Sequence, residues 1–152
     1  MPRHERTKPV YVPPGGPGGV ERPSPGIYEA LGEDGVFELL SDFYRRLGDS
    51  AISSMFPDDL VGASERSAAF FVQLLGGPPL FNERHGPPRM RARHIPFEID
   101  GAARETWLTA FRATLDGSVE RGVFPVEHLP GFLAFLEGFS AWMVNVAPEG
   151  RD

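Results

Sequence analysis

Apolar residues recur every three or four positions along most of the chain, which is the period of an amphipathic α-helix. The pattern predicts a short helix over 27–31, which Gly32 ends, and a longer helix from 34 to about 47. Further helices are expected over 62–75, 89–94, 102–121 and 126–146. No segment alternates apolar and polar residues as a half-buried strand does. The sequence therefore predicts an all-α fold.

Glycine and proline mark the breaks between these helices. The run 76–79 ends the helix over 62–75, and the following segment, 78–90, is expected to be a loop. Pro96 disfavours helix in the residue before it, so 95–100 is expected to be an extended connector. For the helix over 34–47 the spacing predicts a buried face made of Phe37, Leu40, Phe43, Tyr44 and Leu47.

The first 26 residues differ in composition from the rest. They are rich in Pro and Gly and have few apolar side chains, so they neither propagate a helix nor supply a core. We predict a flexible arm over 1–26, a helical domain over 27–147 and a short tail over 148–152. The alternative is an arm that packs on the domain, or on a neighbouring subunit, through Tyr11 and Val12.

Composition narrows the possible functions. The chain has 152 residues and a formal net charge of −6. General binding to nucleic acid or to an anionic membrane is therefore not expected, because like charges repel. It has no cysteine, which excludes disulfides, thiolate zinc sites and cysteine nucleophiles. No apolar stretch has the length of a membrane span or a secretion signal, so a cytoplasmic location is expected. The 12 phenylalanines suggest an aromatic core or pocket.

Common catalytic signatures are absent, and a single histidine is the strongest candidate for chemistry. The four histidines share no spacing that favours a zinc site. His94 ends a short basic helix, before the connector that contains Pro96. A surface histidine in a basic patch is the simpler interpretation. A haem site is the alternative, because haem needs one axial imidazole, an aromatic cage and cations for its propionates, here Arg91 and Arg93.

A set of motifs from residue 27 to residue 147 supports that alternative. The motifs are Phe43-Tyr44, Ala63-x-Glu65-Arg66, Gly76-Gly77-Pro78, Arg84-x-Gly86-x-Pro88-Arg89-Met90-Arg91-x-Arg93-His94-x-Pro96-Phe97, Trp107 and Met143-Val144-Asn145. In combination they resemble a truncated haemoglobin of the second group. The resemblance implies a two-over-two helical sandwich around haem b, with His94 as the proximal iron ligand. It also implies that a backbone carbonyl of the preceding turn orients the imidazole.

The resemblance assigns further residues to the pocket. The residues that would contact the haem, besides His94, are Arg91, Arg93, Phe97, Trp107, Phe81 and Phe56. Those that would face a gas ligand on the distal side are Tyr44, Trp107, Ser67, Phe56, Ala63 and Phe70. Tyr44 and Trp107 carry the hydrogen-bond donors. For both, the alternative role is plain helix packing.

Several distal positions carry smaller or less polar residues than many relatives have. Phe56 and Phe81 stand where Tyr is frequent, and neither has a hydroxyl to donate. Ala63 takes the place of the distal histidine of classical globins and would leave an open entrance. Ser67 replaces a larger side chain and would donate a hydrogen bond or admit water. The expected pocket therefore has few distal donors.

Two classes of function follow from the resemblance. The first is a haem protein that binds dioxygen, nitric oxide and carbon monoxide and turns over nitric oxide or peroxide, with an external reductase as electron donor. The second is a gas carrier, store or sensor without turnover, which includes oxygen transport. A globin-like interaction module without haem is a third, and the full motif around His94 disfavours it. The chain is expected to be a monomer or a homodimer.

Overall fold

The structure, a computed structural model, describes residues 6–17, 21–56 and 58–148. Its α-helices are α1 (Gly26–Gly48), α2 (Leu60–Leu74), α3 (Leu80–His85), α4 (Met90–His94), α5 (Gly101–Glu120) and α6 (Leu129–Met143). Two 3₁₀ turns, η1 (Ser53–Met55) and η2 (Val126–His128), join them. No strand occurs in the described ranges, so the all-α prediction is confirmed. None of the helices described is both long and apolar enough to span a bilayer.

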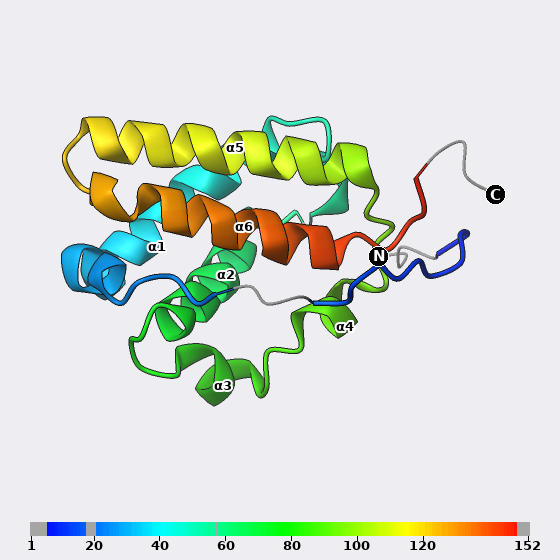
Figure 1. Ribbon diagram of the computed structural model, residues 1–152, viewed down its shortest axis with the longest axis horizontal. Coiled ribbons are helices and arrows are strands. Elements are labelled where there is room, and N and C mark those ends of the chain that lie inside the picture. The colour runs from blue at the N-terminus through cyan, green and yellow to red at the C-terminus, as the bar shows by residue number, and fades with distance from the viewer. Residues whose placement is uncertain (1–5, 18–20, 57, 149–152) are drawn as a thin grey trace.

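Four of the helices form two packed pairs. Figure 1 shows α5 and α6 side by side and antiparallel, with α1 and α2 on the other side of the molecule. α1 packs on α2 and also on α5, which joins the pairs into a two-over-two arrangement. The short helices α3 and α4 lie beyond α2, at the edge of this sandwich. The predicted two-over-two fold is therefore confirmed.

The sequence explains where the long helices begin and bend. Gly32 has φ 68° and ψ 180°, a backbone conformation that favours glycine, and it bends α1 where the sequence predicted a break. Asp59 caps α2, its carboxylate accepting from the N–H of Gly62 at 3.0 Å. Asp100 caps α5 in the same way, accepting from the N–H of Ala103 at 2.8 Å.

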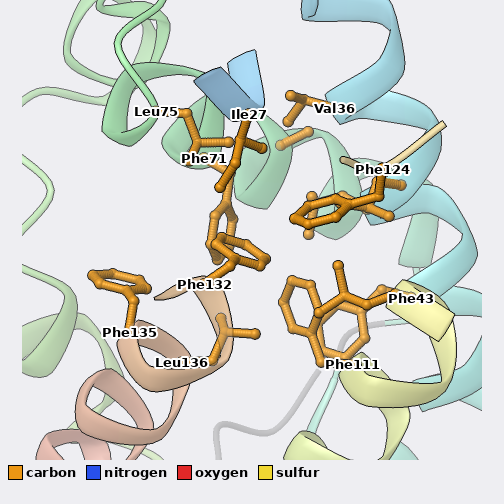
Figure 2. Packing of buried hydrophobic residues seen from close by; sticks show 14 of the residues in the cluster. Ile27, Val36, Phe43, Phe71, Leu75, Phe111, Phe124, Phe132, Phe135 and Leu136 are labelled. Carbon is orange, nitrogen blue, oxygen red and sulfur yellow. The ribbon is translucent and has the colours of Figure 1, made fainter. Parts of the chain in front are cut away.

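The core is a cluster of aromatic rings between the two layers (Figure 2). Phe43 of α1, Phe111 of α5 and Phe132 of α6 are almost completely buried. The ring centroids of Phe43 and Phe111 are 4.1 Å apart, and those of Phe111 and Phe132 are 5.8 Å apart. Burial of these rings holds α1, α5 and α6 together. At the other end of the sandwich, near α4, the structure has a cavity.

Three details differ from the sequence-based expectation. In α1 the core takes Val36 and Leu39, while Phe37 and Tyr44 are only half-buried, so the buried face is rotated. Residues 80–85 form the helix α3 inside the segment expected to be a loop. α6 ends at Met143 and not at 146, because the N–H groups of residues 145 and 146 both donate to the carbonyl of Ile99, at 2.9 and 3.1 Å.

The N-terminal arm also differs from the expectation of a flexible segment. The backbone N–H of Tyr11 donates to the carbonyl of Asn145 at 2.9 Å, and the guanidinium of Arg6 is bonded to the same region. Residues 6–11 therefore lie against the domain, beside α4 and the end of α6 (Figure 1). The side chain of Val12 is 60% exposed, so it takes no part in this contact. The boundaries at residues 26 and 147 stay predictions.

Candidate functional site

A cavity of about 350 Å³ lies between the sandwich and the short helices. It brings together side chains that are as far apart in sequence as Tyr44 and Met143. The predicted site residues that line it are Tyr44, Phe56, Ala63, Ser67, Phe70, Phe81, Arg93, His94, Phe97 and Trp107. Arg91 is the predicted residue that does not line it. The structure therefore assembles the predicted pocket, and the role of each residue in it stays a prediction.

His94 is the last residue of α4 and is placed for coordination of a metal. Its Nδ1 lies 2.6 Å from the carbonyl oxygen of Met90, so the ring nitrogen Nδ1 carries the proton and donates it. Burial lowers the pKa of His94, and the hydrogen bond to Met90 offsets only part of that shift. The imidazole is therefore neutral near pH 7, and its Nε2 has a free lone pair.

The surroundings of His94 favour a cofactor over a bare metal ion. In the described part of the chain, no group of three or more His, Asp or Glu side chains could hold a metal. A metal bound by His94 would therefore receive its other ligands from an organic group. The wall of the cavity is largely aromatic, with Phe70, Phe81 and Phe97 among its residues. Such a wall suits a flat apolar macrocycle.

Tyr44 contributes a hydroxyl from the middle of α1. Its ring packs edge-on against Phe43 and Phe56, with centroids 5.5 and 5.7 Å away. Burial raises the pKa of Tyr44, and a hydrogen bond with Ser67 and the charge of Arg66 reduce that shift. The phenol is therefore protonated at neutral pH, and its hydroxyl is shared with Ser67 of α2.

Trp107 contributes the second predicted donor from α5. Its ring packs against those of Phe43 and Phe111, with centroids 5.5 and 5.3 Å away, which fixes its place in the wall. Within the described residues, the indole N–H of Trp107 donates to no protein acceptor. An N–H in a cavity wall without a protein partner is free to bond a ligand, and in this it differs from the Tyr44 hydroxyl.

The two arginines predicted to bind propionates have other partners. Arg91 donates from Nη1 to the carbonyl of Val144 at 3.0 Å and from Nη2 to that of Tyr11 at 2.7 Å, and its guanidinium stacks over Trp142 at 4.5 Å. Backbone carbonyls outside the cavity hold the donors of Arg91, so the structure gives no support to its predicted contact with the haem, and that contact stays a prediction. Arg93 does reach the cavity.

The guanidinium of Arg93 also donates to backbone carbonyls, which restricts the motion of the side chain. Its Nη2 donates to the carbonyls of His85 and Pro87, both at 2.9 Å, and its guanidinium lies 4.9 Å from the ring centre of Phe81. Arg93 therefore stiffens the loop after α3 and places positive charge at the cavity.

Two cations in the cavity wall were missed by the sequence analysis. Arg66 lies three residues after Ala63 on α2, and Arg104 lies three residues before Trp107 on α5. Residues three apart share a helix face, so this spacing was the available signal. Arg104 is anchored by a hydrogen bond from its Nε to Ser140 Oγ at 3.0 Å. With Arg93, these residues give the cavity three positive charges suited to an anionic edge of a ligand.

Comparison with known proteins assigns the family. The family model for bacterial-like globins matches residues 26–130. The group 2 truncated hemoglobin YjbI of Bacillus subtilis is 39% identical over 90 residues, which cover 59% of this chain and 68% of that protein. The chain belongs to the group 2 truncated haemoglobins. The predicted family is therefore confirmed, and membership implies a haem cofactor and haem-based ligand binding.

Solved structures agree with this assignment over most of the chain. Phosphate-bound Hell's gate globin IV superposes with a TM-score of 0.78 and 36% identity, covering 85% of this chain and 80% of that one. The truncated oxygen-avid haemoglobin of Bacillus subtilis superposes with a TM-score of 0.71 and 35% identity, covering 78% of this chain and 98% of that one. The two-over-two arrangement of this truncated haemoglobin is therefore shared with its relatives.

The residues present fit a haem on the evidence of this structure. His94 offers one neutral imidazole with a free Nε2, the aromatic wall suits the macrocycle, and the arginines suit its carboxylates. Among the described residues no group of three or more His, Asp or Glu side chains could hold a metal, and a single imidazole is the ligand that a globin-type haem iron takes on its proximal side.

Proposed function

We propose that this truncated haemoglobin binds dioxygen, nitric oxide and carbon monoxide at a haem b that His94 holds. The observation that carries the proposal is the geometry of His94. Its Nδ1 proton is engaged by Met90, and its Nε2 is free within an aromatic cavity. The hydrogen bond to Met90 fixes the ring orientation and makes Nε2 a better donor to a metal. When bound, haem supplies the iron coordination site and the redox chemistry.

The other residues of the cavity determine what a gas ligand meets. Besides the three arginines, the wall contains the N–H of Trp107 and the shared hydroxyls of Tyr44 and Ser67 as hydrogen-bond donors. Ala63 places a small side chain in the wall on α2. Among these groups, Trp107 and Tyr44 are the donors that we assign to a polar ligand such as dioxygen.

We further propose that the protein turns over nitric oxide, with a gas carrier or store as the alternative. The reaction joins one nitric oxide and one dioxygen and takes up one electron to give one nitrate. The electron would come from an external reductase. The donors of Trp107 and Tyr44 support this proposal, because they would stabilise negative charge that develops on oxygen. Peroxide reduction would use the same donors and the same electron source.

The first test compares histidine variants by absorption spectroscopy. His94→Gly should lose the haem, or bind it only when imidazole is added, whereas His128→Ala should keep the spectrum of the natural chain. Reduction with dithionite followed by carbon monoxide should shift the Soret band in His128→Ala and in the natural chain. An unchanged spectrum in His94→Gly would remove His94 as the ligand.

The second test separates turnover from carriage. With dioxygen and a regenerating reductant, an enzyme should consume nitric oxide over many cycles and form one nitrate for each molecule consumed. A carrier or store should consume about one nitric oxide for each protein molecule and then stop or continue only slowly, because the reductant would not restore its oxidised form efficiently. The number of cycles therefore decides between the two.

A further inference from the structure

Asn145 connects three parts of the chain next to the segment that carries His94, the proposed proximal ligand. Its side chain is fully buried just after the end of α6. Its Oδ1 accepts hydrogen bonds from the N–H of Ile99 at 3.0 Å and from Nη1 of Arg6 at 2.8 Å. Its Nδ2 donates to the carbonyl oxygen of His94 at 3.2 Å. A buried amide bonded on both sides is a rigid link between these segments.

Arg6 extends this link into the N-terminal arm. Its Nη1 also donates to the carbonyls of Ile95 and Phe97, at 2.9 and 3.0 Å, and its Nη2 donates to the carbonyl of Asn145 at 2.9 Å. The guanidinium therefore holds both carbonyls that flank Pro96, directly after His94. Hydrogen bonds from a charged donor are stronger than neutral ones.

The arm around Arg6 is fastened at a second point. Arg91 of α4 donates to the carbonyl of Tyr11, and the N–H of Tyr11 donates to the carbonyl of Asn145. The arm is thus bonded both to α4 and to the chain after α6. These contacts lie outside the cavity and involve residues that line no part of it, such as Arg6, Tyr11 and Asn145.

The helix that carries His94 needs such support. α4 has only five residues, and none of them belongs to the hydrophobic core. A helix of this length is not stable by itself, because one turn does not repay the cost of nucleation. Its N-cap, Arg89, has φ 41°, a left-handed conformation that costs a non-glycine residue free energy. The hydrogen bond to Met90 orients the His94 ring within α4, and bonds from outside α4 are needed to hold the helix itself in place.

We propose that Arg6 and Asn145 form a proximal clamp, a pair of positioning residues that fix the His94 segment and so set how the imidazole meets the iron. The inference rests on the proposed haem ligation by His94. In the absence of the clamp, α4 would sample more orientations, and the bond from His94 to the metal would become weaker and more variable.

The test starts with the haem-free chain, where the proposed ligation plays no part. Arg6→Ala removes the guanidinium, and Lys8→Ala is the matched control, because among the described residues Lys8 makes hydrogen bonds only through its backbone, which alanine keeps. Arg6→Ala should speed amide hydrogen exchange at residues 94, 95 and 97 by at least about tenfold, the factor expected for one hydrogen bond, because the variant loses several. Lys8→Ala should leave it unchanged. Equal exchange in both variants would overturn the clamp.

The second measurement uses the haem-loaded protein. Arg6→Ala should shift and broaden the iron–histidine stretching band of the ferrous form in resonance Raman spectra and should speed haem transfer to apomyoglobin. Asn145→Asp replaces the Nδ2 donor to the His94 carbonyl by a carboxylate oxygen, keeps an acceptor for Arg6, and should act on the same band. An unmoved band in both variants would overturn the positioning role, even if the variants were less stable.

The two proposals fail in different ways. If His94→Gly kept its haem spectrum, the proposed ligation would be wrong, while the hydrogen-exchange comparison on the haem-free chain would still decide whether the clamp exists. If His94→Gly lost the haem but Arg6→Ala changed neither exchange nor the Raman band, the ligation would stand and the clamp would be wrong.

Discussion

Replacing Trp107 by Phe should speed dioxygen release more than replacing Tyr44 by Phe. The two side chains both line the cavity, but their donors are in different situations. In the described part of the chain, the indole N–H of Trp107 has no protein acceptor, whereas the hydroxyl of Tyr44 is hydrogen-bonded with Ser67. Removing the Tyr44 hydroxyl frees Ser67 to donate in its place. The nearest cavity-lining donor on α5, Arg104, is held by Ser140 Oγ and the carbonyl of Glu137, so it is not free to replace the indole N–H.

The size of the effect follows from the energy of one hydrogen bond. A net hydrogen bond contributes about 0.5–1.5 kcal/mol, which corresponds to a rate factor of roughly two to twelve if dissociation takes the whole effect. Trp107→Phe should lie toward the upper end of that range. Tyr44→Phe should stay below about threefold, because Ser67 compensates. The phenyl ring of the Trp107 variant keeps the contacts with Phe43 and Phe111, so the cavity changes little in shape.

Stopped-flow dissociation rates of dioxygen and carbon monoxide provide the measurement. Carbon monoxide accepts hydrogen bonds less readily, so its release should respond less to either variant. Equal acceleration of both gases by Trp107→Phe would show that the indole acts as a steric gate. No acceleration of dioxygen release would refute its role as a donor.

Two further predictions concern stability and pH. Phe111 is completely buried and its ring contacts those of Phe43 and Phe132, so Phe111→Ala should lower the free energy of unfolding by about 3–5 kcal/mol, measured by denaturant titration of the haem-free chain. Partial desolvation would raise the pKa of Glu98, but hydrogen bonds from Lys8 and Thr7 and the charge of Arg6 outweigh it and lower the pKa. Because docking of the arm lowers the pKa of Glu98, the ionised carboxylate stabilises the docked arm at pH values above the pKa of the free carboxyl. This stabilisation is lost as the pH falls through the pKa that Glu98 has when the arm is docked. The amide NMR shifts of the arm should therefore change as the pH falls below the pKa of a free glutamate, about 4.3, and Glu98→Gln should remove this response; a response that persists in the variant would assign it to another group.

The sequence predicted most of the helices because their signals are local. The glycine that bends α1 and the carboxylates that cap α2 and α5 act within a few residues, so periodicity and turn chemistry locate them. The end of α6 was misplaced for the opposite reason. The apolar pattern continues to Val146, but the N–H groups of residues 145 and 146 pair with the carbonyl of Ile99, which lies more than 40 residues away.

The functional site, like the helices, has features that the sequence specified and features that depend on distant partners. Motifs around His94, Tyr44 and Trp107 named the residues of the pocket, because each motif specifies a side chain on a helix of known period. They did not show which cations face the cavity. Arg91 and Arg93 are equally basic in the sequence, and only the positions of distant carbonyls turn Arg91 away from the cavity.

The N-terminal arm marks the limit of what composition determines. The Pro and Gly content of the arm excludes a helix. This conclusion follows from the backbone properties of these residues alone and needs no knowledge of what they contact. Whether such a segment is free or docked depends on partners elsewhere, and here the guanidinium of Arg6 meets the Asn145 side chain and the carbonyls after His94. The sequence determined the helices, because these depend on near neighbours, and the resemblance to a known family named the residues of the pocket. The tertiary structure alone decided which polar groups meet across the fold, because a hydrogen bond exists only where both partners are brought within about 3 Å.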